Sequence, residues 1–139
     1  MLTSSRPLDK TQCPNLNCRT CQCLEKGDCT VSNVIYEITC TAPGCNANYI
    51  GETYRPLHLR FMEHWRSANN PTATSYVNKP LAKHYTAEHP NTKPSLLLKV
   101  LEKAYSTNNR KICEARLISK VKPKLNERSE QIEIQHYLV

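Results

Sequence analysis

Two cysteines and two histidines in the middle of the chain have the spacing of a zinc site. Cys40 and Cys45 flank a turn-forming stretch, and His84 and His89 follow much later, just before Pro90. Zinc prefers four soft or borderline ligands in a tetrahedron, which two close pairs can supply once folding brings them together. The competing interpretation makes Cys40 a small buried residue at a strand end and leaves both histidines on the surface. We favour zinc, because such a site would tie the two segments together and stabilise a small core.

Residues 1–32 carry five more cysteines and show no helical or strand period. They are Cys13, Cys18, Cys21, Cys23 and Cys29. Five thiols for four coordination positions leave the ligand set of a second metal site open. The segment is therefore expected to be an arm whose order depends on metal. Because residues 1–10 have no apolar run, the cysteines favour metal binding in a reducing compartment over disulfides.

A third group combines two tyrosines with an arginine, a histidine, a glutamate and an asparagine. The residues are Tyr36, Tyr49, Arg60, His64, Glu114 and Asn126. Arg60 and His64 are four positions apart on an expected helix, so they share a face and can point together at the sheet. Taken singly, each residue also has a structural interpretation, the tyrosines as core residues and the charged side chains as an ordinary helix surface.

The elements that must position these residues alternate in type. A β-branched and aromatic run predicts a strand over 34–39, a turn follows at 41–46, and 48–51 is expected to complete a hairpin. Pro56 opens an expected helix, and a short helix follows Pro80. The apolar residues 95–101 predict a third, buried strand. Caps at 106–109 precede a last helix that ends at Pro123 and is marked by Ile112, Ala115, Ile118 and Val121.

A chain of 139 residues suffices for one compact domain. The element order predicts the α/β class, with a small antiparallel three-stranded sheet flanked by helices. We divide the chain into a Cys-rich arm (1–32), the domain itself (33–128) and a tail (129–139) that could add a strand or remain loose. Cys113, alone on the last helix, is expected to be a buried apolar residue.

The positive charge is concentrated near the end of the chain. The formal net charge of the chain is +7. Residues 99–128 hold nine basic and three acidic side chains and so account for +6 of it. Such a run is either a solvated helix face or a basic strip that faces a polyanion. No apolar stretch approaches the ~20 residues of a membrane span, so no membrane partner is expected.

The order of the motifs resembles the GIY-YIG endonuclease family. The resemblance runs from about Asn33 to Asn126 through Val34-Ile35-Tyr36, Tyr49-Ile50-Gly51, Arg60, His64, Glu114 and Asn126. It is closest to the endonuclease domain of Penelope-like retroelements, which has a cysteine pair between the tyrosine motifs, a histidine pair downstream and a Cys-rich approach. Cys40 and Cys45, His84 and His89, and the arm stand at those places. Val34 replaces the Gly of the family motif and is compatible with a strand.

The resemblance implies a divalent-metal-dependent DNA endonuclease that nicks target DNA for retroelement insertion. Glu114 would hold a catalytic Mg²⁺ or Mn²⁺, and Arg60 would bind the scissile phosphate. Tyr36 would be the base or position the water, with Tyr49 and His64 completing the network, and Asn126 would orient phosphate or metal-bound water. Zn²⁺ would be structural, held by Cys40, Cys45, His84 and His89.

The same resemblance implies a nuclear location, DNA as partner, and a reverse transcriptase in cis or in trans. The chain would be the endonuclease part of a larger protein or a stand-alone descendant. The alternative is a zinc-stabilised DNA-binding module without cleavage activity. A zinc-bound protein-interaction domain would leave the tyrosine, arginine and glutamate set unexplained.

Overall fold

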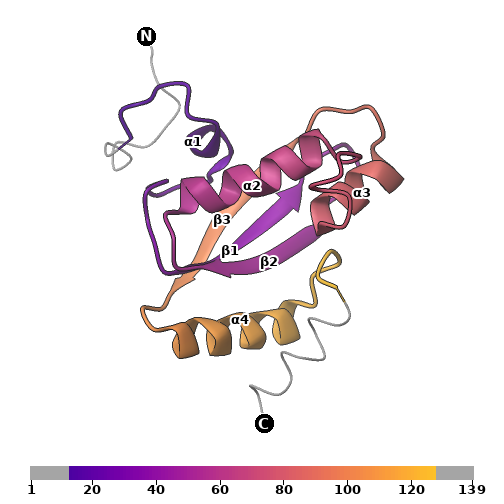
Figure 1. The fold of residues 1–139 in the computed structure, drawn as a ribbon. Helices are drawn as coiled ribbons and strands as arrows, with labels where there is room; N and C mark the ends of the chain where they lie inside the picture. Colours follow the sequence, from indigo (N-terminus) through magenta and orange to yellow (C-terminus); the bar gives the residue numbers. More distant parts are fainter. Residues whose placement is uncertain (1–12, 128–139) are drawn as a thin grey trace.

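The computed structural model describes residues 13–127, so the question of whether the tail 129–139 adds a strand lies outside the described residues. Its elements are α1 (Arg19–Cys23), β1 (Val34–Cys40), β2 (Asn48–Thr53), α2 (Leu57–Asn69), α3 (Pro80–Glu88), β3 (Leu96–Lys103) and α4 (Thr107–Val121), as Figure 1 shows. The prediction of an α/β protein with a small antiparallel three-stranded sheet flanked by helices is confirmed.

The sheet has the order β2-β1-β3, so the hairpin strand β2 is an edge and β1 is the centre. Tyr36 of β1 stands opposite Gly51 of β2. On the other side of β1, Cys40 stands opposite Leu96, and the register shifts between Ile35 and Tyr36.

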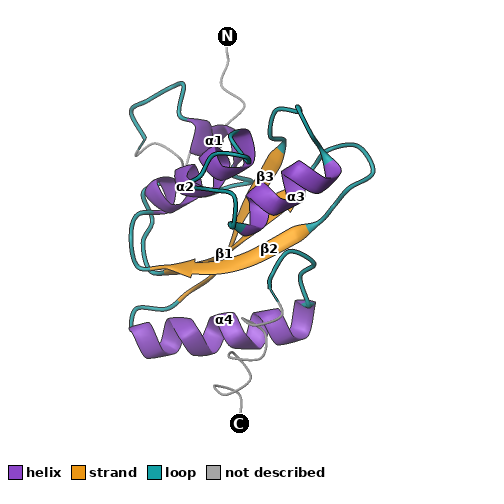
Figure 2. Cartoon of the chain, turned by 45° about the vertical axis from the view of Figure 1, so that its right-hand side comes forward, coloured by secondary structure: helices purple, strands orange, loops and turns teal. Residues whose placement is uncertain are grey.

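Helices cover both faces of the sheet, α2 and α3 on one and α4 on the other (Figures 1 and 2). Alternation along β1 sends Tyr36 and Ile38 into the larger core cluster, with Phe61 of α2. Ile35 points the other way and packs with Ile118 of α4. The sheet therefore has two buried faces, and each presents different residues of the same strands.

Local sequence explains where the longer helices begin and end. Pro56 precedes the first residue of α2, and Pro80 is the first residue of α3, where its missing N–H costs nothing. The Ser106 side chain caps α4 by accepting the Asn109 N–H at 3.0 Å. Lys122 ends α4 in the left-handed conformation. Within residues 13–127, no helix combines the length and the apolar character needed to span a membrane.

The predicted burial of the third strand and of the last helix needs correction. The third strand is not buried throughout, because β3 is an edge: Lys99 is exposed and Leu101 is only partly buried. On α4, Ile112 and Val121 are 41% and 43% exposed. Two residues three positions apart on a helix differ by roughly 60° in direction around the axis. The first and last residues of a series with this spacing therefore point away from the buried face.

The N-terminal segment contains a helix that its sequence did not predict. This helix is the short α1, and the Glu25 N–H donates to the Leu98 carbonyl at 2.8 Å. Leu24 and Cys29 belong to the core cluster on the α2 face. A helix of five residues is too short for its period to be visible in the sequence, which explains the omission.

Candidate functional site

The four residues expected to bind zinc converge in the structure. Cys40 ends β1, Cys45 lies in the hairpin turn, His84 lies within α3 and His89 follows its last residue. Their ligand atoms all lie within 4.8 Å of one another. The interpretation that left both histidines on the surface is wrong, because His84 is only 6% exposed.

The distances between the sulfur and nitrogen atoms of this cluster suit a tetrahedrally coordinated metal ion. Cys45 Sγ lies 3.3 Å from His84 Nε2 and 3.4 Å from His89 Nε2, and Cys40 Sγ lies 3.6 Å from His89 Nε2. Zinc bonds of about 2.3 Å to sulfur and 2.0 Å to nitrogen place such ligand pairs roughly 3.5 Å apart. The cluster could therefore hold a structural metal such as zinc, and it would join the hairpin turn to α3.

One supporting residue of this cluster was not recognised in the sequence. The Tyr85 hydroxyl lies 3.3 Å from Cys40 Sγ and accepts the Ser95 N–H at 3.0 Å. Groups that contact a ligand in this way fix its orientation. The only available signal was an aromatic residue directly after His84.

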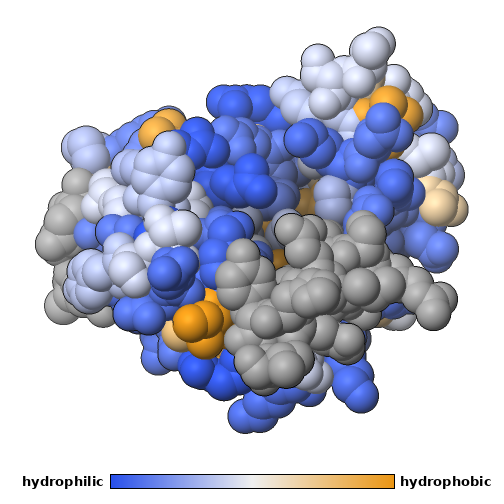
Figure 3. All heavy atoms as spheres, turned by 60° about the horizontal axis from the view of Figure 1, so that its bottom comes forward, coloured by the Kyte–Doolittle hydropathy of each residue, from blue (hydrophilic) through white to orange (hydrophobic). Residues whose placement is uncertain are grey.

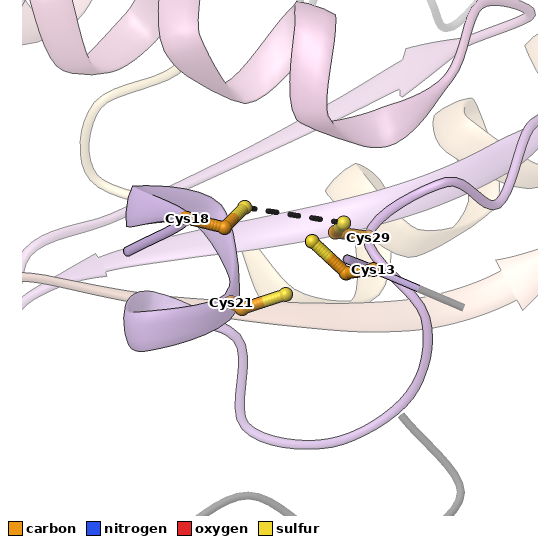
Figure 4. Close-up of side chains that lie close together, drawn as sticks. All are labelled: Cys13, Cys18, Cys21 and Cys29. Atoms are coloured by element: carbon orange, nitrogen blue, oxygen red, sulfur yellow. Dashed lines mark hydrogen bonds between the residues drawn. The ribbon is translucent and has the colours of Figure 1, made fainter. Parts of the chain in front are cut away.

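Four of the five cysteines of the N-terminal segment form a second cluster. The sulfurs of Cys13, Cys18, Cys21 and Cys29 lie within 4.8 Å of one another, and Figure 4 shows them pointing to a common centre from α1 and its flanking loops. The Cys18 and Cys29 sulfurs are 4.0 Å apart. The structure thus settles which four thiols could share a metal and leaves Cys23 outside.

In the second cluster, the pKa values of the Cys13 and Cys29 thiols are shifted in opposite directions. Hydrogen bonding to the Asn15 backbone lowers the pKa of Cys13 to about 7. Burial raises the pKa of Cys29, since a thiolate there would be poorly solvated. A divalent cation would reverse the second effect, because it stabilises thiolates directly.

Cys113 belongs to neither cluster. It is half-buried rather than buried, and its sulfur lies 3.6 Å from Glu102 Oε1.

Tyr36, Arg60 and His64 form a hydrogen-bonded chain. The Tyr36 hydroxyl lies 2.7 Å from His64 Nε2, and Arg60 Nε donates to the same hydroxyl at 3.2 Å. Tyr49 completes the group, with its ring centroid 5.2 Å from that of His64. The prediction that Arg60 and His64 point together at the sheet is confirmed.

Burial keeps both ends of the tyrosine–histidine contact neutral. It lowers the pKa of His64 to about 3, and the Arg60 guanidinium adds to the effect. It also raises the pKa of Tyr36, an effect that Arg60 opposes and the Glu114 carboxylate increases. With Arg60 donating to its oxygen, the Tyr36 hydroxyl still has one hydrogen and one lone pair, so the tautomer of His64 decides which of the two groups donates in this contact.

Gly51 allows this chain to lie against the edge strand. A methyl group built on Gly51 would stand 2.5 Å from the Tyr36 hydroxyl oxygen and 3.0 Å from the Tyr49 ring. Any side chain there would displace one of the tyrosines.

A cavity of about 450 Å³ opens beside the hydrogen-bonded chain of Arg60, Tyr36 and His64. Tyr49, Arg60 and His64 line one part of it, and Tyr76 and Lys79 line another. Tyr36 itself has no exposed surface and reaches the cavity only through its two hydrogen-bond partners.

The remaining two residues of the expected set lie elsewhere. Glu114 is half-buried on α4, across the sheet from α2, and among the described residues it does not line the cavity. Its charge still acts on Tyr36. Asn126 is 5% exposed, accepts the Ile50 N–H at 2.9 Å and donates to the Ile50 carbonyl at 2.9 Å. In the structure, Asn126 therefore holds the edge strand.

The basic segment is partly neutralised. Arg110 and Lys111 both pair with Glu52 at 2.8 Å, and Arg116 pairs with Glu102 at 2.9 Å. Sequence reasoning missed Glu52 because it lies in β2, 58 residues before Arg110, whereas Glu102 is one of the three acidic residues counted within the segment. Seen from below, where α4 lies in Figure 1, the visible surface is largely hydrophilic with isolated apolar side chains (Figure 3).

Comparison of the chain with protein-family models, with curated proteins and with solved structures found no match. The fold and the two Cys/His clusters therefore define this protein as a small α/β domain with two places for a structural metal.

Proposed function

We propose that this protein is a divalent-metal-dependent DNA endonuclease that hydrolyses phosphodiester bonds and nicks target DNA for retroelement insertion. The observation that carries the proposal is the hydrogen-bonded chain of Arg60, Tyr36 and His64 beside the 450 Å³ cavity. A chain of this kind has a clear use in phosphodiester hydrolysis, whereas a core needs only apolar packing. In this setting the protein acts in the nucleus, together with a reverse transcriptase in cis or in trans.

Arg60 is suited to neutralise the charge of the scissile phosphate. Its Nε donates to Tyr36, and its Nη1 donates to Glu63 at 2.7 Å. Among residues 13–127, this leaves Nη2 to donate to a phosphate oxygen at the cavity. A guanidinium held on two sides loses little freedom when it binds, and it stays charged at any working pH.

In the reaction, a water oxygen adds to phosphorus and the bond from phosphorus to the 3′ oxygen breaks, which yields a 5′ phosphate and a 3′ hydroxyl. Tyr36 holds Arg60 and His64 in place through its hydroxyl. Tyr49 and His64, which face the cavity, orient the attacking water. Because burial keeps the phenol and the imidazole neutral, the pair acts through hydrogen bonds that hold Arg60 and the attacking water in place.

The Glu114 carboxylate is a hard oxygen ligand of the kind that Mg²⁺ and Mn²⁺ prefer, and its charge acts on Tyr36 from the other face of the sheet. Glu114 would hold the divalent cation, which would supply the positive charge that activates water and stabilises the leaving oxygen. Asn126 supports the edge strand β2 by holding Ile50.

The test is nicking of supercoiled plasmid with Mg²⁺ or Mn²⁺. We expect Arg60→Ala and Glu114→Gln each to slow nicking by about 10²- to 10³-fold, as loss of one stabilising group does in other enzymes. Arg66→Ala is the matched control on the same helix, and Glu88→Gln is the control for the carboxylate, since both residues are exposed. Divalent cation should be omitted rather than chelated, because a chelator would also remove structural metal.

Wild-type protein that binds DNA but leaves plasmid intact with every divalent cation would favour the alternative, a zinc-stabilised DNA-binding module. The two Cys/His clusters are the observation that supports this alternative. Protein that neither binds nor nicks DNA would contradict both proposals.

A further inference from the structure

The wall of the cavity that faces α2 belongs to the connection between α2 and α3. Tyr76, Lys79 and Pro80 line it. The connection is built from successive turns: the Tyr76 N–H donates to the Ala73 carbonyl at 2.9 Å, and the Lys79 N–H donates to the Tyr76 carbonyl at 2.8 Å. Pro80 then starts α3. Lys79 therefore extends from a backbone that hydrogen bonds hold in place.

Lys79 differs from Arg60, the other cation that lines the cavity, and from Lys83, which pairs with the lining residue Glu127. Arg60 pairs with Glu63 at 2.7 Å, and Lys83 pairs with Glu127 at 3.0 Å. The Lys79 ammonium has no ion-pair partner within the described part of the chain. Its charge is available for a ligand without first breaking a contact.

The charges of Lys79 and Arg60 both act on His64. Burial is the main reason that the pKa of His64 is lowered, and both cations add to it. The two positive side chains thus line one cavity together with His64, and an anion between them would be attracted by both.

We propose that Lys79 binds a DNA backbone phosphate adjacent to the one that Arg60 binds, and so positions the strand in the cavity. This inference rests on the proposed endonuclease function of the same site. A lysine suits the task, because its ammonium is a point charge that tolerates variation in phosphate position, whereas Arg60 provides the directional contact. Such a contact adds affinity without sequence preference.

The experiment measures binding of a short fluorescein-labelled DNA duplex by anisotropy, without Mg²⁺, between roughly 50 and 300 mM KCl. Lys79→Ala should lower the slope of log Kd against log salt by about 0.9, the value for one lost phosphate contact. Lys79→Arg should restore the slope. Lys93→Ala is the matched control, an exposed lysine that follows α3 and does not line this cavity.

Nicking kinetics provide the second measurement. A residue that binds the strand should raise KM in Lys79→Ala and leave kcat within about twofold, whereas a general loss of structure would lower kcat as well. If wild type binds and nicks DNA but Lys79→Ala has the same salt slope and KM, the inference is wrong and the proposed function stands. If wild type neither binds nor nicks DNA, the proposed function fails, and this inference fails with it.

Discussion

The hydroxyl of Tyr36 is the most constrained atom of the candidate site. It lies in a completely buried side chain, is hydrogen-bonded to His64, accepts from Arg60 and faces the bare backbone of Gly51. A change at any of these neighbours must move it, because close-packed interiors leave no spare volume.

We predict that Gly51→Ala disturbs the site directly. The added methyl group would stand 2.5 Å from the Tyr36 hydroxyl oxygen, so the phenol must leave His64 or the strand must shift. Overpacking of this kind costs about 1–3 kcal/mol, and nicking should fall to near that of Tyr36→Phe. Urea unfolding and the plasmid assay measure the two effects.

Gly27→Ala is the control for this substitution. Gly27 has a φ of +102°, and a methyl group there meets no atom within 4 Å. Its substitution should lower stability through backbone strain and leave the rate of nicking unchanged. Equal activity of wild type and Gly51→Ala would contradict the close contact at Tyr36.

His64 should make stability depend on pH. Its pKa is lowered to about 3 in the folded protein, against about 6.5 in the unfolded chain. Between these values the unfolded state binds a proton that the folded state does not. The free energy of unfolding should therefore fall as pH decreases from about 6.5 towards 3, by up to about 1.4 kcal/mol per pH unit from this group.

Urea titrations across this range in wild type and His64→Gln isolate the contribution, since other titrating groups are common to both proteins. The pH slope should be smaller in the variant. Identical slopes would mean that His64 is protonated in the folded protein.

At the level of elements, the segment after α4 closes the open edge of β2. Asn126 pairs with both backbone groups of Ile50, and the Leu125 N–H donates to the Asn48 carbonyl at 2.9 Å. Unpaired edges invite pairing with other chains, so this contact also protects the sheet.

We predict that Asn126→Ala lowers the free energy of unfolding by about 1–3 kcal/mol, because it leaves buried backbone groups without their partner. Asn108→Ala, at an exposed position in α4, should change it by less than about 0.5 kcal/mol. Urea unfolding distinguishes the two. A loss of nicking in Asn126→Ala at unchanged stability would instead indicate a direct role with phosphate.

Local patterns predicted those parts of the structure that local forces decide. The β-branched run found β1, and helical spacing placed Arg60 and His64 on one face. Long-range packing decided the rest. The spacing of the cysteines does not distinguish Cys23 from its neighbours. The sequence around Glu52 does not indicate that its ion-pair partners lie in α4. Likewise, only the fold places Glu114 across the sheet from Arg60 and joins Asn126 to Ile50.

At the scale of the whole molecule, both clusters pack against the core on the α2 face of the sheet. One joins the hairpin turn to α3, and the other folds the N-terminal segment around α1. Arg19 of α1 lies over the Trp65 ring of α2, 3.8 Å from its centroid, so the second cluster also connects to the helix that carries Arg60.

We predict two bound zinc ions per chain, one for each group of four ligands. Cys21→Ser should lose one ion, and Cys23→Ser should keep both, because Cys23 lies outside the cluster. Elemental analysis of purified protein measures the content. Equal zinc loss in the two variants would show that the ligand set differs from the geometry described above.

The strand order has a consequence for the time course of folding. β1 pairs with β2 through a short turn, but its other partner, β3, lies beyond α2 and α3, and closing so long a loop is slow. The metal ligands shorten this search: Cys40 stands opposite Leu96, and His89 comes shortly before Leu96 in the chain. A metal captured early by the hairpin turn and α3 would deliver the start of β3 to its place, so zinc should speed refolding as well as stabilise the folded state.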